Sequence, residues 1–244
     1  MSSTNDHRYL AIAAATQAMT ANPPDTIADA FAELLAQATV HIPGAEDAAV
    51  TVVERQNQIC TPASTGEWPR TLDTIAQKHL QSPTFTTAGG GEPQFVDDLH
   101  TEQRWPLFRA DALAHTPIRS IASYRLFRTR TAVGALTLYS VTDSGLHQTA
   151  RDLGVFFAAH ASIIVDAVRR TEQFETALAS RDTIGQAKGM IMERYNVDAQ
   201  RAFALMRKLS QDSNTRVFDV ARTLVDIEHP TRCETATPPA GQKV

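Results

Sequence analysis

The stretch SIASYRLFRTRTAVGALTLY, from Ser120 to Tyr139, is the part of the sequence that decides the fold. Its two halves, 120–127 and 132–139, are rich in apolar, aromatic and β-branched residues at the spacing of strands. The polar residues 128–131 between them suit a turn. The stretch therefore predicts an antiparallel hairpin, and the chain on either side of it must supply what covers the sheet.

Further strands and helices are predicted before this hairpin. Residues 48–53 are β-branched, with 58–61 as their hairpin partner, and a second strand pair is predicted at 84–86 and 94–96 across a turn at 89–91. Helical spacing of apolar residues predicts helices within 9–40, at 72–80 and at 104–115. The first of these is divided by Pro23 and Pro24, with Asp25 capping the second part. This mixture predicts an α+β fold, with an antiparallel sheet and flanking helices.

A long helix without proline is predicted after the hairpin, from about residue 146 to Arg194. Its apolar side chains step alternately by four and three, which is the spacing of a heptad seam. The seam consists of Leu153, Phe157, His160, Ile164, Ala167, Thr171, Phe174 and Leu178. Two interpretations remain open for the part up to Val168: a stalk that pairs with a second copy, or a helix lying on the sheet of its own domain.

Two shorter amphipathic helices are predicted after the long one. Asp198 is the expected cap of the first, and Asn214 or Thr215 is the expected cap of the second. The predicted apolar faces are Ala202, Leu205, Met206 and Leu209 in the first helix, and Val217, Val220, Ala221, Leu224 and Val225 in the second. We expect a small three-helix unit, followed by an unstructured tail.

Composition excludes several classes of protein. The chain has 244 residues, 43% of them hydrophobic, and its 23 Lys and Arg against 27 Asp and Glu give a formal charge of -4. Nucleic-acid binding would therefore have to be local rather than a property of the whole surface. Only Cys60 and Cys233 occur, which disfavours a disulfide framework or structural zinc. No apolar stretch is long enough for a membrane helix, so we expect a cytoplasmic protein without membrane contact.

The stretch IGQAKGMIMERYNVDAQRAFALMRKLSQDSNTRVFDVARTLVD, from Ile184 to Asp226, resembles the ANTAR domain. The match extends over nearly the whole module. It rests on residues 187–189, Ala202-Phe203, 205–207, Ser210-Gln211 and 219–221. The resemblance implies an RNA-binding output domain of a bacterial transcription antitermination regulator.

The region 24–168 is similar to a GAF domain of the kind that actinobacterial regulators place before ANTAR. The similarity rests on Val96-Asp97-Asp98-Leu99, on 104–108, on Ile118-Arg119-Ser120 and on 134–139. The family binds small molecules in a pocket between the sheet and its covering helices, or acts as a scaffold for dimers. The resemblance therefore implies a sensor domain that can bind a small-molecule ligand of unknown identity.

The ANTAR-like module carries seven basic and seven acidic side chains between Asp182 and His229, so bulk charge cannot hold RNA there. Gly185 and Gly189 lie four residues apart in a predicted helix, although each glycine lowers the stability of a helix by about 1 kcal/mol relative to alanine. Either an RNA backbone beside Lys188 or a crossing helix would explain them. Side chains that could contact unpaired bases, or serve as caps and solvated surface, are Arg207, Ser210, Gln211, Asn214 and Arg216. Three aromatic side chains are expected in the core, namely Tyr195, Phe203 and Phe218.

Five aromatic residues of the GAF-like region could line a ligand pocket or form ordinary core. They are Phe85, Phe95, Trp105, Phe108 and Tyr124. Asp97, Asp98 and His100 lack the further ligands of a metal site. The run Gly89–Gly91 lacks the Lys-Ser/Thr ending of a phosphate loop, and no nucleophile has an evident base partner. We expect neither an enzyme nor a cofactor.

The leading hypothesis is a transcription antitermination regulator that binds stem-loop RNA of nascent transcripts under control of the sensor domain. The expected organisation is an N-terminal helix at 1–23, a GAF-like sensor at 24–168, a stalk at 169–181, the RNA-binding module at 182–229 and a tail at 230–244. A homodimer through the stalk is expected. The alternatives are a DNA-binding helix-turn-helix regulator with the helix from Arg216 in the major groove, and a small-molecule-binding protein whose helical end only mediates assembly.

Overall fold

The computed structural model describes residues 2–228, with side chains for residues 6–227. The predicted tail 230–244 lies outside the described residues. The chain divides into two compact units, with the division between Glu172 and Gln173. Among residues 2–228, no helix combines the length and the apolar character needed to cross a membrane.

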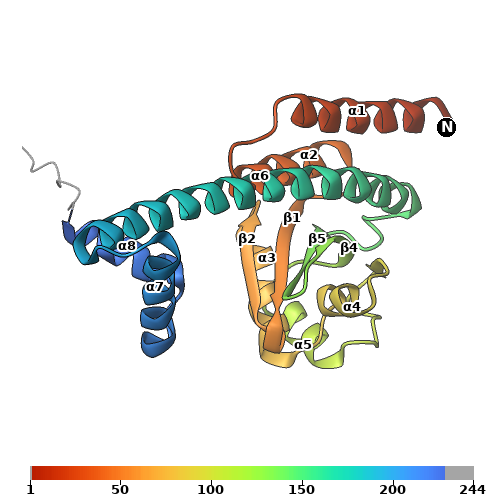
Figure 1. The fold of residues 1–244 in the computed structure, drawn as a ribbon. Coiled ribbons are helices and arrows are strands. Elements are labelled where there is room, and N and C mark those ends of the chain that lie inside the picture. Colours follow the sequence, from red (N-terminus) through yellow and green to blue (C-terminus); the bar gives the residue numbers. More distant parts are fainter. Residues whose placement is uncertain (1, 229–244) are drawn as a thin grey trace, which may run out of the picture. The chain divides into compact units, whose positions relative to one another are not determined.

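The first unit is built on a five-stranded antiparallel sheet in the order β2-β1-β5-β4-β3 (Figure 1). The predicted hairpin supplies its centre, with β4 (Ser120–Arg128) paired to β5 (Ala132–Ser140). The other predicted hairpin is β1 (Asp47–Glu54) and β2 (Ile59–Ser64), joined by the short helix η1 (Arg55–Asn57). β3 (Gln94–Val96) pairs with β4 at the far edge. The α+β prediction is confirmed.

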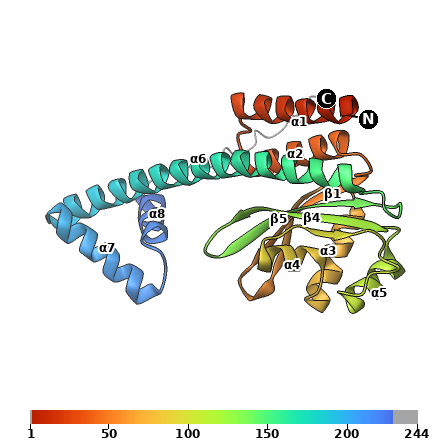
Figure 2. The ribbon, with the colours of Figure 1, turned by 90° about the vertical axis from the view of Figure 1, so that its right-hand side faces the viewer.

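Helices cover both faces of this sheet (Figures 1 and 2). On one face lie α2 (Ile27–His41) and the first part of α6 (Gln148–Tyr195), with α1 (Ser2–Ala21) packed outside them. On the other face lie α3 (Glu67–His79), α4 (Pro83–Gly90) and α5 (Pro106–His115). Because side chains alternate along each strand, the two faces have separate hydrophobic cores.

The predicted strand at 84–86 is wrong, because these residues lie in α4. Ser82 caps this helix by accepting a hydrogen bond from the Phe85 N–H (3.1 Å), and Pro83 occupies its first turn. The predicted glycine turn is also corrected, since only Gly91 leaves the helix, with a φ of 83°. Residues 84–86 therefore form a helix in spite of the strand propensity of three consecutive β-branched or aromatic residues.

The second helix at the N-terminus is capped by Thr26 and not by Asp25. The Thr26 hydroxyl oxygen accepts a hydrogen bond from the Asp29 N–H at 3.1 Å. Thr26 is the residue directly before the first helical position, where such a cap must stand.

The heptad seam of α6 does not behave as one surface. Its first members, among them Leu153, Phe157 and Ile164, are buried in the core of the first unit. The alternative of a helix lying on its own sheet is therefore confirmed up to Val168. After it, Phe174 is 70% exposed and Leu178 is 50% exposed.

The second unit contains the end of α6, α7 (Ala199–Ser213) and α8 (Val217–Glu228). Its small core consists of Ala187, Ile191, Ala202, Met206 and Ala221. Asp198 caps α7 as predicted, accepting from the Arg201 N–H at 2.7 Å.

Two predictions about this unit are corrected. Asn214 ends α7 in the left-handed region (φ 51°), and the first hydrogen bond of α8 runs from the Val220 N–H to the Arg216 carbonyl (3.1 Å), so neither Asn214 nor Thr215 caps α8. Leu205 and Leu209 are also more exposed than predicted, at 39% and 49%. The core of this unit encloses Met206 but not these two leucines, which α7 turns toward solvent.

Candidate functional site

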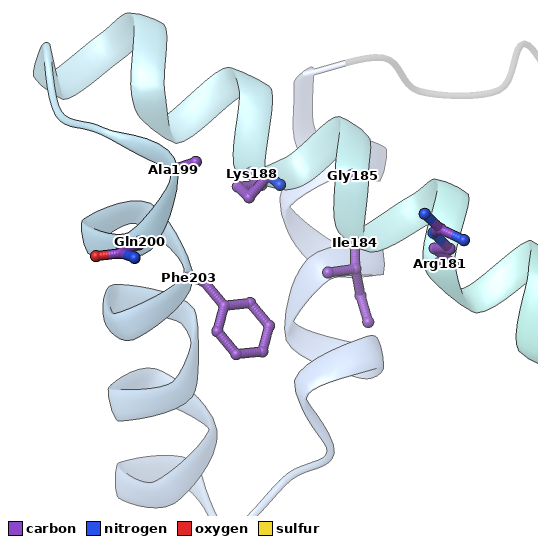
Figure 3. A pocket seen from close by; sticks show the side chains of 7 residues that line it. All are labelled: Arg181, Ile184, Gly185, Lys188, Ala199, Gln200 and Phe203. Carbon is purple, nitrogen blue, oxygen red and sulfur yellow. The ribbon is translucent and has the colours of Figure 1, made fainter.

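A cleft of about 440 Å³ lies between α6 and the start of α7 (Figure 3). The α6 wall carries Arg181, Gly185 and Lys188, which are spaced by four and three and therefore share one helix face. The rest of the lining is Ile184, Ala199, Gln200 and Phe203. Two of the predicted RNA-binding residues, Gly185 and Lys188, thus meet at one place.

The glycines of α6 leave open space beside the helix. A Cβ built on Gly185 or on Gly189 would meet no heavy atom within 4 Å. The alternative of a tightly crossing helix is therefore wrong for both positions. The neighbouring residue Ala187 is the one that packs, since it is fully buried in the three-helix core. The Ala187-Lys188-Gly189 motif thus combines a packing residue with two that face outward.

The cleft is electropositive at its α6 wall. Within residues 2–228, neither Arg181 nor Lys188 forms an ion pair or a side-chain hydrogen bond. The α7 N-terminus adds the N–H groups of Ala199 and Gln200, which have no acceptor inside the helix because they belong to its first turn. A helix N-terminus attracts anions through such groups and through the helix dipole. The Asp198 carboxylate works against this attraction, although its oxygen is engaged by Arg201 N–H.

An aromatic side chain that we predicted to be core lines the same cleft. Phe203 is 43% exposed and points into the space between the helices (Figure 3). Tyr195 is 63% exposed, so it is not a core residue either, whereas Phe218 is half-buried. The reason is the narrow alanine core, which leaves no interior large enough for aromatic rings.

The sequence reasoning missed Arg181, Gln200 and Phe203 as members of this cleft. Arg181 could have been found from its spacing, because it stands four and seven residues before Gly185 and Lys188 on the same helix face. Gln200 and Phe203 lie on a different helix. Their approach to Lys188 depends on how α7 packs, and no sequence spacing encodes it.

Of the remaining predicted RNA-binding residues, Gly189 follows Lys188 on α6. The others begin at Arg207, about 12 Å along α7 from its first residue at 1.5 Å per residue, and continue into the turn before α8. Two of them serve the turn into α8: the Ser210 hydroxyl donates to the Thr215 carbonyl (2.6 Å), and Asn214 is the left-handed cap. Arg207, Gln211 and Arg216 are exposed, and in the described part of the chain their side chains form no hydrogen bond. The structure thus divides the predicted residues into the α6–α7 cleft and the α7–α8 turn.

The cleft combines the two kinds of group that single-stranded RNA requires. Arg181, Lys188 and the N–H groups of α7 can hold a phosphate, and an exposed aromatic ring can stack on an unpaired base. The open flank at Gly185 lets a sugar-phosphate backbone approach the helix closely. Recognition of this kind needs few cations, which agrees with a module that is electrically neutral as a whole.

The predicted ligand-binding residues of the first unit do not line one cavity. Phe85, Trp105 and Phe108 pack on the α3–α5 side of the sheet, where the Trp105 indole N–H donates to the Thr86 hydroxyl at 3.0 Å. Phe95 and Tyr124 lie on the other side, in edge-to-face contact at 5.8 Å between ring centres. A pocket on the α3–α5 side could therefore include Phe85, Trp105 and Phe108 but not Phe95 or Tyr124.

The acidic turn after β3 is engaged in ion pairs. Both oxygens of Asp98 accept hydrogen bonds from the Arg119 guanidinium (2.8 and 2.7 Å), which holds the pKa of that carboxyl well below its usual range. Asp97 pairs with Arg151 at the start of α6. The turn therefore ties β3 to β4 and to α6. Among the described residues there is no cluster of three His, Cys, Asp or Glu that could hold a metal ion.

The comparisons with known proteins agree with this two-part architecture. A model described as GAF domain matches residues 25–166, and a model described as ANTAR domain matches residues 172–225. The chain belongs to the GAF domain family. With the ANTAR domain that follows, it has the organisation of a GAF–ANTAR regulator, and both of its domains are of regulatory rather than catalytic type.

Solved structures support the fold of the first unit. The GAF domain of a phosphoenolpyruvate-protein phosphotransferase from Acinetobacter is 12% identical, with a TM-score of 0.50 over 68% of this chain and 98% of that one. Free methionine-R-sulfoxide reductase from Neisseria meningitidis is 12% identical, with a TM-score of 0.51 over 69% of this chain and 93% of that one. At this identity the likeness concerns the fold alone. No curated protein matches the chain.

Proposed function

We propose that this protein is a transcription antitermination regulator whose ANTAR domain binds stem-loop RNA in nascent transcripts under control of the GAF domain. A stabilised stem-loop would prevent a terminator from forming, so that transcription continues. The protein would act in the cytoplasm, where nascent RNA is made, and without catalysis.

The observation that carries this proposal is the α6–α7 cleft. Lys188 and Arg181 stand there without a partner among the described residues, beside an open glycine face and an exposed aromatic ring. A folding requirement would not explain two unpaired cations and a half-exposed phenylalanine around one hollow. A bound loop nucleotide would satisfy all of them, with Gly189 and the turn residues Arg207, Ser210, Gln211, Asn214 and Arg216 as further contacts.

We also propose that two copies associate through the part of α6 that follows the first unit. Phe174 and Leu178 are four residues apart on one helix face, and both expose large apolar side chains. A pairing of two such helices would cover them. The GAF domain would bind a small molecule, with Phe85, Trp105 and Phe108 as the aromatic part of its pocket on the α3–α5 side.

The test is binding of the full-length protein to a tandem stem-loop RNA and to duplex DNA of the same sequence at physiological salt. We expect RNA-selective binding, and a loss of at least about tenfold in affinity for Lys188→Ala, because a charged contact of this kind is worth about 1.5–3 kcal/mol. Arg222→Ala is a matched control, since Arg222 lies on α8 and pairs with Asp226. A preference for duplex DNA would instead favour the helix-turn-helix alternative. A folded Lys188→Ala protein with unchanged RNA affinity would refute the assignment of the cleft.

A further inference from the structure

A second hollow, of about 300 Å³, lies between α3 and the edge strand β2. Four of its lining residues, Arg70, Asp73, Thr74 and Gln77, share one face of α3 at spacings of three and four. The other two, Ile59 and Thr61, alternate along β2 and point to the same side. None of them belongs to the aromatic pocket proposed above.

The floor of this hollow is a buried carboxyl group. Asp73 is 3% exposed, and its Oδ2 accepts hydrogen bonds from the hydroxyls of Thr51 and Thr61, both at 2.7 Å. Its Oδ1 has no hydrogen-bond partner among the described residues. In that part of the chain, Gln81 Oε1 is the one fully enclosed side-chain atom without a partner, so Oδ1 of Asp73 still reaches solvent. The hollow thus presents an acceptor that no protein group uses.

The rim of the hollow presents donors. The Arg70 guanidinium donates one hydrogen bond to the Thr61 carbonyl (3.2 Å), and its other N–H groups have no partner within residues 2–228. Gln77 accepts from the Ile59 N–H through its Oε1 (2.6 Å), which leaves its amide N–H₂ free to donate. A matching ligand would therefore carry a hydrogen-bond donor for the floor and an acceptor for the rim.

We propose that this hollow binds a free amino acid, with its ammonium group on Asp73 and its carboxylate on Arg70 and Gln77. An ammonium donates to the open Oδ1 and forms an ion pair with a buried carboxylate that has none within residues 2–228. A guanidinium and an amide N–H₂ are suitable donors for a carboxylate. The inference adds a second ligand site to the proposed sensor domain, and so it rests on that part of the proposed function.

The experiment is titration calorimetry of the full-length protein at pH 7.5 without RNA, so its failure is distinct from a failure of RNA binding. The probes are the twenty amino acids, ethanolamine as the amine that matches L-serine without its carboxylate, and acetate as an acid without an amine. We expect at least one amino acid to bind, and ethanolamine and acetate to bind at least about tenfold more weakly. No amino acid binding, or binding of ethanolamine as tight as that of the best amino acid, would overturn the proposal.

Two variants locate the binding. Asp73→Asn keeps an acceptor for both threonine hydroxyls and should fold, and we expect it to lose about tenfold or more in amino-acid affinity. Asp111→Asn removes a carboxylate on α5, outside the hollow, and should leave the affinity unchanged. Equal affinities of the wild type and Asp73→Asn would also overturn the proposal.

Discussion

The buried Asp73 predicts an unusual dependence of stability on pH. Burial raises the pKa of this carboxyl from 3.8 to about 6, although hydrogen bonds from Thr61 and Thr51 and the charge of Arg70 lower it. The pKa of Tyr139 is raised by burial and by the charge of Asp73. A shift of about two pKa units corresponds to about 3 kcal/mol. Because the folded state binds the proton more tightly, this stabilisation is complete below about pH 4 and is lost as the pH rises through 6.

Asp73→Asn should remove this dependence. At pH 7.5 we expect the free energy of unfolding of the variant to exceed that of the wild type by about 2 kcal/mol. This difference is below 3 kcal/mol because a neutral amide accepts weaker hydrogen bonds than a carboxylate. The advantage should shrink as the pH falls from 7.5 to 4.5 and disappear below about pH 4, where the carboxyl is protonated in the unfolded state as well.

The assay for this prediction is urea unfolding followed by tryptophan fluorescence between pH 4.5 and 8. Both tryptophans, Trp68 and Trp105, lie in the first unit, so the signal reports that unit. Asp111→Asn is the control. Lys78 and His79 lower the pKa of Asp111 to about 2, so its ionised carboxylate stabilises the folded state, and the substitution should make the protein less stable at pH 7.5. A difference between Asp73→Asn and wild type that stays constant over this pH range, or that favours the wild type at pH 7.5, would refute the reasoning.

Three further predictions concern other parts of the chain. Gly189→Ala should stabilise the C-terminal unit by about 1 kcal/mol in thermal unfolding by circular dichroism, because its Cβ meets nothing within 4 Å, while weakening RNA binding; a less stable variant would contradict the open face. Gly154→Ala should destabilise the first unit by about 1–3 kcal/mol in urea unfolding, because its Cβ would come within 2.3 Å of the Tyr124 hydroxyl; unchanged stability would contradict that contact. Phe174→Glu should halve the mass measured by light scattering without loss of helicity, and an unchanged dimer mass would exclude this part of α6 as the interface.

The parts of the fold that local signals determine were predictable from the sequence. The strands at 120–127 and 132–139 and the cap Asp198 follow from residue types that act over a few positions. Residues 84–91 were not predictable in the same way. Thr84 and Thr87 have high strand propensity, yet both lie in a helix and are buried against the sheet, with the Thr87 hydroxyl donating to the Ser123 carbonyl at 3.4 Å. Contacts with distant strands therefore decide the structure of that segment.

The candidate site was predictable on one helix and not across two. Lys188 and Gly185 stand out because a charge at the rim of a core and an unneeded glycine are visible in the sequence. Phe203 carries no such mark, since an aromatic residue on an amphipathic helix is more often buried. It is exposed because alanines at 187, 202 and 221 bring the helices together on another line. Which side chains remain outside a small core depends on where the helices contact one another, and the residue pattern of a single helix does not determine that contact.

The burial pattern of α6 limits how the sensor can control the RNA module. The last sensor contacts on this helix are Val168, which is buried, and Glu172, whose carboxylate accepts a hydrogen bond from the Ile27 N–H at 2.7 Å. The first residue that packs in the C-terminal core is Ile184. Residues 173–183 belong to neither core, and they form the covalent connection. A ligand shifts an equilibrium only by its difference in affinity for the two states. If the proposed control passes along α6, the two states differ in what residues 173–183 do, for example in whether Phe174 and Leu178 are paired with a second copy, and the proposed ligand binds one of these states more tightly.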